Sequence, residues 1–290
     1  MLQHRLLFGT LMTALFIAVA VFDGWLDGSL TAGDGDDKRV QGTFLYVLVC
    51  VLILLAQHEF RRLARAKKLK IFYPVCGVAC ILLAGTRYWL QLFEVPAAVY
   101  LFFLFAFSTM GLVLFQYIRY GTSGVMANCG VNSFSIVYLG ILSGFVIAVR
   151  IEFGLWPVLM FVFAVKSADI GAYAWGTLFG KHKFAPGISP GKTWEGMAGA
   201  LVTAAAVSIL FAASCDIMVW WLAGAFGCCA AITGQMGDLV ESMIKRDAEQ
   251  KDSAATVPGF GGILDIVDSP LVAAPFAYLF FVFALGRPIC

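Results

Sequence analysis

Charged residues are scarce in this sequence. Asp, Glu, Lys and Arg make up 13% of its 290 residues, whereas hydrophobic residues make up 61%. Charged residues supply about 25% of an average soluble domain, so this composition, with a mean hydropathy of +0.87, argues against a soluble globular protein. The net charge is only +2, and no overall electrostatic field therefore favours nucleic acid as a partner.

Histidine is rare as well, and cysteine shows no disulfide pattern. The sequence has three histidines, scattered far apart, which disfavours a histidine zinc site. Of the eight cysteines, five fall within apolar stretches, where small buried hydrophobic residues are expected. These five are Cys50, Cys76, Cys80, Cys228 and Cys229.

Long apolar stretches are what the chain has in abundance. A helix of about 20 apolar residues spans a bilayer, and nine stretches approach this length. They lie near 5–22, 42–58, 71–90, 96–118, 133–150, 155–180, 196–214, 217–240 and 269–286. We therefore expect an all-α, polytopic integral membrane protein with about nine transmembrane helices.

Basic residues favour one side of the predicted membrane. With the N-terminus in the cytoplasm, 14 of the 20 Lys and Arg residues fall in cytoplasmic segments and five fall outside. Because basic residues concentrate on the cytoplasmic side, we expect a bacterial-type inner (plasma) membrane protein whose segments 181–195 and 241–268 face the cytoplasm. The basic run 61–70 is expected to contact anionic lipid headgroups there.

The chain changes character near its middle. The first four spans are simple and apolar, which predicts an N-terminal membrane region over residues 1–132. The later spans carry polar residues that lipid would not tolerate, which predicts a catalytic membrane region with five spans and cytosolic loops over residues 133–290.

The stretch near 155–180 carries the first of these polar residues. Lys166 and Asp169 are three residues apart and share a helix face, so one interpretation is a self-neutralising pair in the bundle interior. Asp169 is followed by Tyr173, Gly176 and Gly180 at helical spacing, which predicts a face packed against protein or a cavity. We favour a site role for Asp169.

The loop 181–196 is rich in groups that bind phosphate. Ser189, Lys192 and Thr193 could cradle a phosphate, although the G-x-x-x-G-K-T spacing is one residue short of a P-loop and follows a helix rather than a strand. Glu195 falls at the start of the next helix, where an acid suits the helix dipole and could serve as a cap alone.

The segment from Gln235 to Ser269 is the most polar part of the chain. One helix face carries four polar residues across two turns: Asp238, Glu241, Ser242 and Lys245. Asp238 lies inside an apolar window, where a carboxylate needs a partner such as a divalent cation. A glycine turn, Pro258-Gly259-Phe260-Gly261-Gly262, then leads to Asp265 and Asp268, which share a face if that stretch is helical.

These motifs resemble the phosphatidate cytidylyltransferase family over roughly residues 160–275. The family patterns S-x-x-K-R-x-x-x-x-K-D, P-G-H-G-G and L-D-R-x-D-S are matched in order by Ser242, Lys245, Arg246, Lys251, Asp252, Pro258, Gly259, Gly261, Gly262, Leu264, Asp265, Asp268 and Ser269. Two positions depart from the patterns, because Phe260 replaces a histidine and Ile266 replaces an arginine.

The resemblance implies transfer of a cytidylyl group from CTP to phosphatidate, with Mg²⁺ as cofactor and a two-cation site as the favoured version. It implies metal-binding roles for Asp238, Asp265 and Asp268. The implied catalytic residues are Asp238, Lys245, Arg246, Lys251, Asp252 and Asp265. The implied substrate-binding residues are Asp169, Tyr173, Ser189, Lys192, Thr193, Glu195, Ser242, Gly259, Gly261 and Gly262.

Three alternatives stay open at this point. The chain could be a CTP-dependent enzyme acting on another lipid, such as a polyprenol kinase or an ether-lipid cytidylyltransferase. It could be a catalytically weakened paralogue, given Phe260 and Ile266, or a transporter with an intramembrane ion site. Clustering of the polar motifs on the cytosolic side disfavours a transporter, which needs access from both faces. Membrane lipid is an expected partner, and a homodimer is left open.

Overall fold

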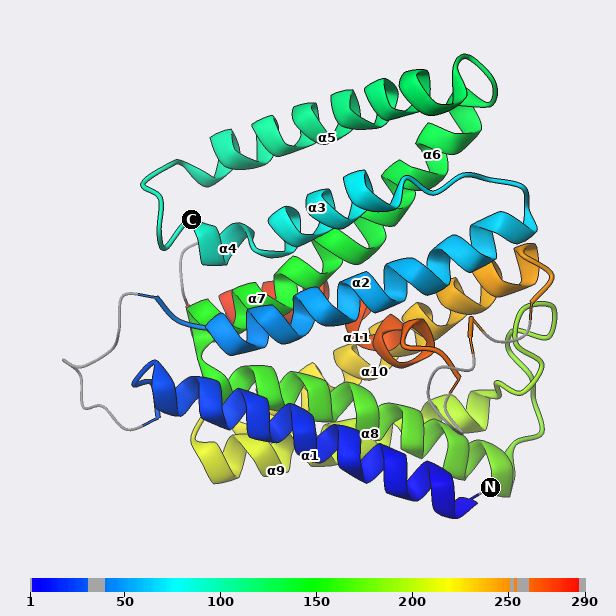
Figure 1. Ribbon diagram of the computed structural model, residues 1–290. Coiled ribbons are helices and arrows are strands. Elements are labelled where there is room, and N and C mark those ends of the chain that lie inside the picture. Colours follow the sequence, from blue (N-terminus) through cyan, green and yellow to red (C-terminus); the bar gives the residue numbers. More distant parts are fainter. Residues whose placement is uncertain (1, 31–39, 251–252, 255–260, 287–290) are drawn as a thin grey trace. The chain divides into compact units, whose positions relative to one another are not determined.

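A computed structural model describes residues 2–30, 40–250, 253–254 and 261–286, with side chains from residue 11 onward. Every named element in this part of the chain is a helix (Figure 1), which confirms the all-α expectation. The helices are α1 (Leu2–Leu26), α2 (Thr43–Ala66), α3 (Tyr73–Ala84), α4 (Thr86–Trp89), α5 (Ala97–Tyr120), α6 (Val125–Ser135), the π-helix η1 (Ile136–Ile141), α7 (Leu142–Phe153), α8 (Leu155–Phe179), α9 (Trp194–Cys215), α10 (Trp220–Asp247) and α11 (Leu264–Leu285).

Six helices in the described residues are long and apolar enough to cross a membrane. They are Thr43–Ala66, Ala97–Tyr120, Val125–Phe153, Leu155–Phe179, Trp194–Cys215 and Leu264–Leu285. The apolar parts of two further predicted spans are shorter, at Leu11–Leu26 and Tyr73–Ala84. The predicted span near 217–240 lies in α10, which is absent from the six and whose C-terminal part is polar from Gln235 onward. The protein is an integral membrane protein, but the expected count of nine spans is not confirmed.

The chain folds as two compact units. Unit 1 consists of Met1–Ile151 and Asp247–Ile266, and unit 2 consists of Glu152–Arg246 and Val267–Cys290. The sequence predicts a change from simple apolar spans to a catalytic region after residue 132. The two compact units do not test this prediction, because they reflect packing rather than function.

Two asparagines of α6 hold the connection between α2 and α3 in unit 1. The Asn132 Oδ1 atom accepts a hydrogen bond from the Phe72 backbone N–H at 2.7 Å, and its Nδ2 atom donates to the Lys70 carbonyl oxygen at 2.7 Å. The Asn128 Oδ1 atom accepts from the Lys70 N–H at 3.1 Å. These side chains satisfy backbone groups that would be costly to bury alone.

A buried ion cluster joins α1 to α7 within unit 1. Arg150 is fully buried, and its guanidinium contacts Asp23 Oδ2 at 3.1 Å and Asp27 Oδ2 at 2.6 Å. The Asp23 Oδ1 atom also accepts a hydrogen bond from the Phe44 N–H at the start of α2. Removing one partner of such a cluster typically costs about 3–5 kcal/mol, so these residues fix the three helix ends together.

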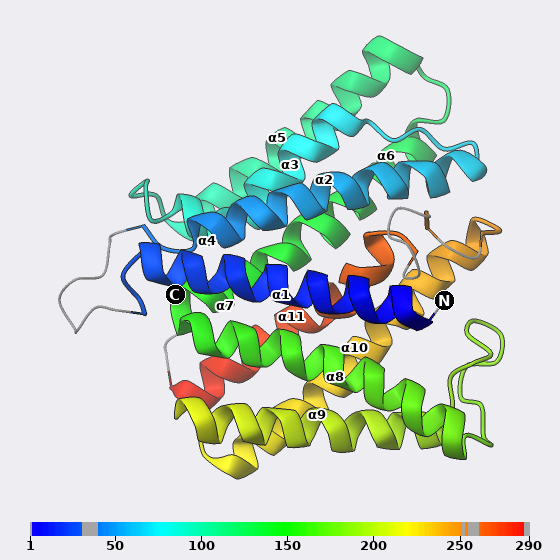
Figure 2. The same cartoon turned by 60° about the horizontal axis from the view of Figure 1, so that its bottom comes forward.

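Small residues bring α8 and α9 together in unit 2, where they run side by side (Figure 2). A Cβ atom at Gly171 would lie 2.8 Å from the Gly199 carbonyl oxygen, so only glycine fits there. The Thr203 hydroxyl donates to the Ser167 carbonyl oxygen at 3.1 Å across the same contact. This is the close helix packing that small and hydroxyl residues give in membranes.

Candidate active site

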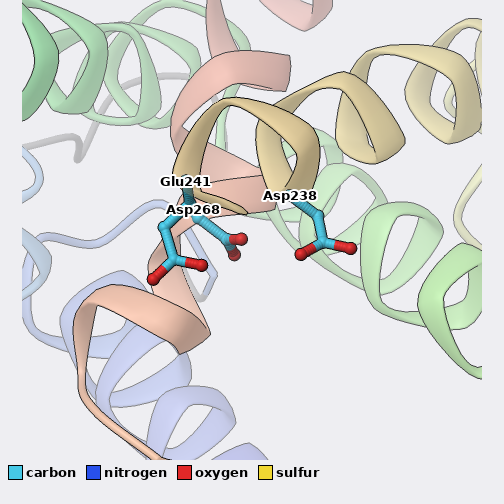
Figure 3. Close-up of side chains that lie close together, drawn as sticks. All are labelled: Asp238, Glu241 and Asp268. Carbon is cyan, nitrogen blue, oxygen red and sulfur yellow. The ribbon is translucent and has the colours of Figure 1, made fainter. Parts of the chain in front are cut away.

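Three carboxylates converge in unit 2. Asp238 and Glu241 project from α10 and Asp268 projects from α11, and the three side chains lie close together (Figure 3). One oxygen of each lies within 4.8 Å of the others. Glu241 and Asp268 are buried, whereas Asp238 is partly exposed. We call these three residues the carboxylate cluster.

The local backbone explains why the carboxylate cluster forms. Asp238 and Glu241 are three residues apart on α10 and therefore share a face. At Gly237 the backbone of α10 comes so close to α11 that a Cβ atom would lie 2.6 Å from the Asp268 carbonyl oxygen. The absence of a side chain at this position lets α11 approach α10 closely at Asp268.

Two lysines neutralise part of this negative charge. The Lys192 Nζ atom lies 2.7 Å from Asp238 Oδ2, and the Lys245 Nζ atom lies 2.5 Å from Glu241 Oε2. Lys192 also donates to the Gln235 carbonyl oxygen at 3.0 Å, which draws the 181–193 loop onto α10. Acids for a cation and bases for phosphate thus lie within hydrogen-bonding distance of each other.

A second acidic position adjoins this group through Gln235. The Gln235 Nε2 atom donates to Asp169 Oδ1 at 3.2 Å, and Asp169 Oδ2 contacts Lys166 Nζ at 3.4 Å. The self-neutralising pair considered for Lys166 and Asp169 is therefore present, and Gln235 couples it to the helix that carries Asp238.

The 181–193 loop is closed at its base by Glu195. The Glu195 carboxylate accepts hydrogen bonds from the Lys181 and His182 backbone N–H groups at 3.2 Å each and contacts the His182 ring at 2.6 Å. The Thr193 Oγ1 atom caps α9 by accepting from the Gly196 N–H at 3.1 Å. Both residues shape the loop, and their predicted contact with substrate is not tested by these bonds.

Asp265 has its described contacts within unit 1. Its Oδ2 atom accepts a hydrogen bond from the Gly262 N–H at 2.6 Å and lies 2.9 Å from the Ser253 hydroxyl oxygen. Gly261 adopts a φ of +100°, a conformation that favours glycine. The stretch from Leu264 onward is helical, so Asp265 and Asp268 share a face of α11 as expected.

The remaining predicted residues lie apart from these contacts or outside the described chain. The Tyr173 side chain is 72% exposed. The other members of its predicted stripe do contact protein, because Asp169 bonds to Gln235 and the two glycines, Gly176 and Gly180, approach Thr193. Ser189 and Ser242 are half-buried, and Arg246 is exposed, with its Nε atom donating to the Ile188 carbonyl oxygen. Lys251, Asp252, Gly259 and Phe260 lie outside the described residues.

Sequence reasoning assigned no site role to four residues that are buried with polar partners. In unit 2, Glu241 was placed on the same helix face as Asp238 but not among the predicted metal ligands, and Gln235 was given no role. In unit 1, Ser253 was given no role, and neither was Glu59 of α2, whose carboxylate accepts a hydrogen bond from the Ser253 hydroxyl. A glutamate at the end of an apolar stretch is itself a signal, because burying it requires partners.

The sequence of this chain matches a known protein family. The profile of the cytidylyltransferase family matches residues 39–284. The chain belongs to the cytidylyltransferase family. The resemblance inferred from the motifs is thereby confirmed, and the family match extends well beyond the motif-bearing residues 160–275.

Three curated relatives carry the name phosphatidate cytidylyltransferase. The chain is 33% identical over 229 residues to the phosphatidate cytidylyltransferase of Bacillus subtilis, covering 74% of this chain and 81% of that protein. It is 41% identical over 124 residues to the enzyme of that name from Mycobacterium bovis, covering 43% of this chain and 40% of the relative. The Haemophilus influenzae relative is 39% identical over 137 residues, covering 46% of this chain and 48% of that relative. The chain thus spans less than half the length of the last two.

Proposed function

We propose that this protein transfers a cytidylyl group from CTP to phosphatidate, giving CDP-diacylglycerol and pyrophosphate. The observation that carries the proposal is the carboxylate cluster with Lys192 and Lys245 bonded to it. The names of the relatives support the same substrates.

The reaction requires neutralisation of negative charge rather than a protein nucleophile. A phosphate monoester has a second pKa near 6, so the phosphatidate phosphate is already a dianion at neutral pH. One of its oxygens attacks the α-phosphorus of CTP, the bond to the β-phosphate oxygen breaks, and pyrophosphate leaves. Because an anion attacks an anion, positioning and neutralisation of charge supply most of the catalysis.

The carboxylate cluster suits Mg²⁺. Mg²⁺ prefers oxygen ligands at about 2.0–2.1 Å, and oxygens within 4.8 Å of one another can share one such ion after small movements. Asp238, Glu241 and Asp268 would hold the ion, which would polarise phosphoryl oxygens and neutralise developing charge when bound. Metal binding by Asp265, and a second cation, stay predictions.

The lysines have a role that follows from their contacts. Lys192 and Lys245 pair with Asp238 and Glu241, so both ammonium groups lie beside the carboxylates that would hold a cation and could bind substrate phosphates there. Lys192 sits on the 181–193 loop, which lets it follow the nucleotide, whereas Lys245 is fixed on α10. Lysine suits this task as a compact, flexible point charge.

We further propose an inner-membrane location with the site open to the cytoplasm, where CTP is available. The support is the distribution of basic residues together with bacterial relatives. Nine spans and a homodimer stay predictions.

The test is an assay of the purified protein with CTP, Mg²⁺ and a panel of lipids comprising phosphatidate, an archaeal-type ether phosphatidate and polyprenol. We expect CDP-diacylglycerol, identified by mass after lipid extraction, from phosphatidate. Product only from the ether lipid or only from polyprenol would replace the proposal with one of the alternative CTP-dependent activities.

A further inference from the structure

Glu59 of α2 binds the start of α11 within unit 1. Its Oε1 atom accepts a hydrogen bond from the Ile263 N–H at 2.9 Å, and its Oε2 atom accepts from the Leu264 N–H at 2.8 Å. The first N–H groups of a helix have no partner inside the helix, and a negative charge is favourable there. Glu59 is only 3% exposed, so these bonds are shielded from water.

The Ser253 side chain connects Glu59 to Asp265. The Ser253 hydroxyl oxygen lies 3.2 Å from Glu59 Oε2 and 2.9 Å from Asp265 Oδ2, and it can donate to either carboxylate. Ser253 is fully buried. One side chain therefore links the acid of α2 to the acid that the family motif places in the catalytic machinery.

The glycine turn is shaped around these two carboxylates. A Cβ atom at Gly262 would collide with the Ser253 hydroxyl and the Glu59 carboxylate, and one at Gly261 would meet the Asp265 carboxylate. The two glycines therefore make room for the chain's own acids. Their predicted contact with substrate stays untested.

We propose that Glu59 is a positioning residue that orients Asp265 by holding the turn 261–264. The proposal rests on the proposed function, because it assigns Glu59 a part in the same reaction. Glu59 fixes the backbone donors of Ile263 and Leu264, the Gly262 N–H fixes the Asp265 carboxylate, and Ser253 couples the two. Support of this kind typically changes activity by about 10–100-fold when it is lost.

The first experiment measures the turn without reference to catalysis. Glu59→Gln keeps the size of the side chain but offers only one acceptor atom, so either Ile263 or Leu264 loses its bond. Hydrogen exchange of the purified protein should accelerate at least about tenfold at the amides of 262–264, since bonds to charged groups are strong. Gln57→Ala is the matched control, because Gln57 is buried on the same helix but bonds to Ser135.

The second experiment separates positioning from general stability. Glu59→Gln should lower kcat for cytidylyl transfer at least about tenfold, with the KM for phosphatidate unchanged, and Glu59→Asp should restore part of kcat. Gln57→Ala should lower thermal stability about as much as Glu59→Gln does, but it should keep the parent kcat.

Faster exchange in the turn together with reduced kcat in Glu59→Gln supports the proposal. Unchanged exchange overturns it, and so does faster exchange with the parent kcat. If the parent protein makes no CTP-dependent lipid product, the proposed function fails, and the exchange result then decides alone whether Glu59 holds the turn.

Discussion

At the scale of single residues, Asp238 offers a direct test of the carboxylate cluster. It belongs to the carboxylate cluster and contacts Lys192 at 2.7 Å. Asp238→Asn keeps the size of the side chain but removes the charge that would hold a cation. We expect turnover to fall at least about a hundredfold at limiting Mg²⁺, in line with loss of a principal electrostatic group, as measured by CDP-diacylglycerol formation.

Asp247→Asn is the control for this substitution. Asp247 lies on the same helix, is largely exposed and contacts Lys67 at 3.3 Å, so its loss should leave turnover near the parent value. If Asp238→Asn purified as a folded protein also keeps near-parent turnover at limiting Mg²⁺, the cation site has been placed wrongly.

Local spacing in the sequence predicted some of these contacts and could not predict others. Asp238 and Glu241 meet because helical geometry puts residues three apart on one face. Lys192 reaches Asp238 from a loop, whose path no periodicity encodes. Glu59 reaches Ile263 across 204 residues of sequence, a contact that depends on tertiary packing.

At the scale of helices, the approach of α10 to α11 at Gly237 sets the spacing of the carboxylate cluster. In Gly237→Ala the new Cβ atom would lie 2.6 Å from the Asp268 carbonyl oxygen, so α11 must move away. A displacement of about 1 Å can cost about a hundredfold in rate, and we expect a loss of that size in cytidylyl transfer.

Gly224→Ala is the matched control on the same helix. Its Cβ atom would meet its nearest neighbour, Ile209 Cδ1, at an ordinary 3.4 Å. Turnover should stay at the parent value, because alanine favours helix over glycine and the site is untouched. Equal turnover in both variants would show that the close approach at Gly237 does not set the site.

The sequence predicted the positions of the helices more accurately than the number of transmembrane spans. Apolar windows predicted α5, α8, α9 and α11 within a few residues. The span expected near 71–90 divides into α3 and α4. α10, which carries polar residues from Gln235 onward, is not among the six helices that are long and apolar enough to cross a membrane. Composition alone does not distinguish apolar residues that face lipid from those that face protein.

At the scale of the whole molecule, the orientation in the membrane is the property most open to test. The basic residues predict that the segment 241–268 faces the cytoplasm. A cysteine introduced as Gln250→Cys, in a background whose native accessible cysteines are replaced, should resist a membrane-impermeant thiol reagent in intact cells. It should react after permeabilisation, and labelling in intact cells would refute the proposed orientation.

The most direct test of the central claim follows the phosphorus of CTP. The purified protein is incubated with phosphatidate, Mg²⁺ and CTP labelled either in the α-phosphate or in the γ-phosphate, and the lipid is extracted. Cytidylyl transfer predicts that α-label enters the lipid and γ-label leaves as pyrophosphate. Label from the γ-phosphate in the lipid, with none from the α-phosphate, would contradict cytidylyl transfer and identify a kinase instead.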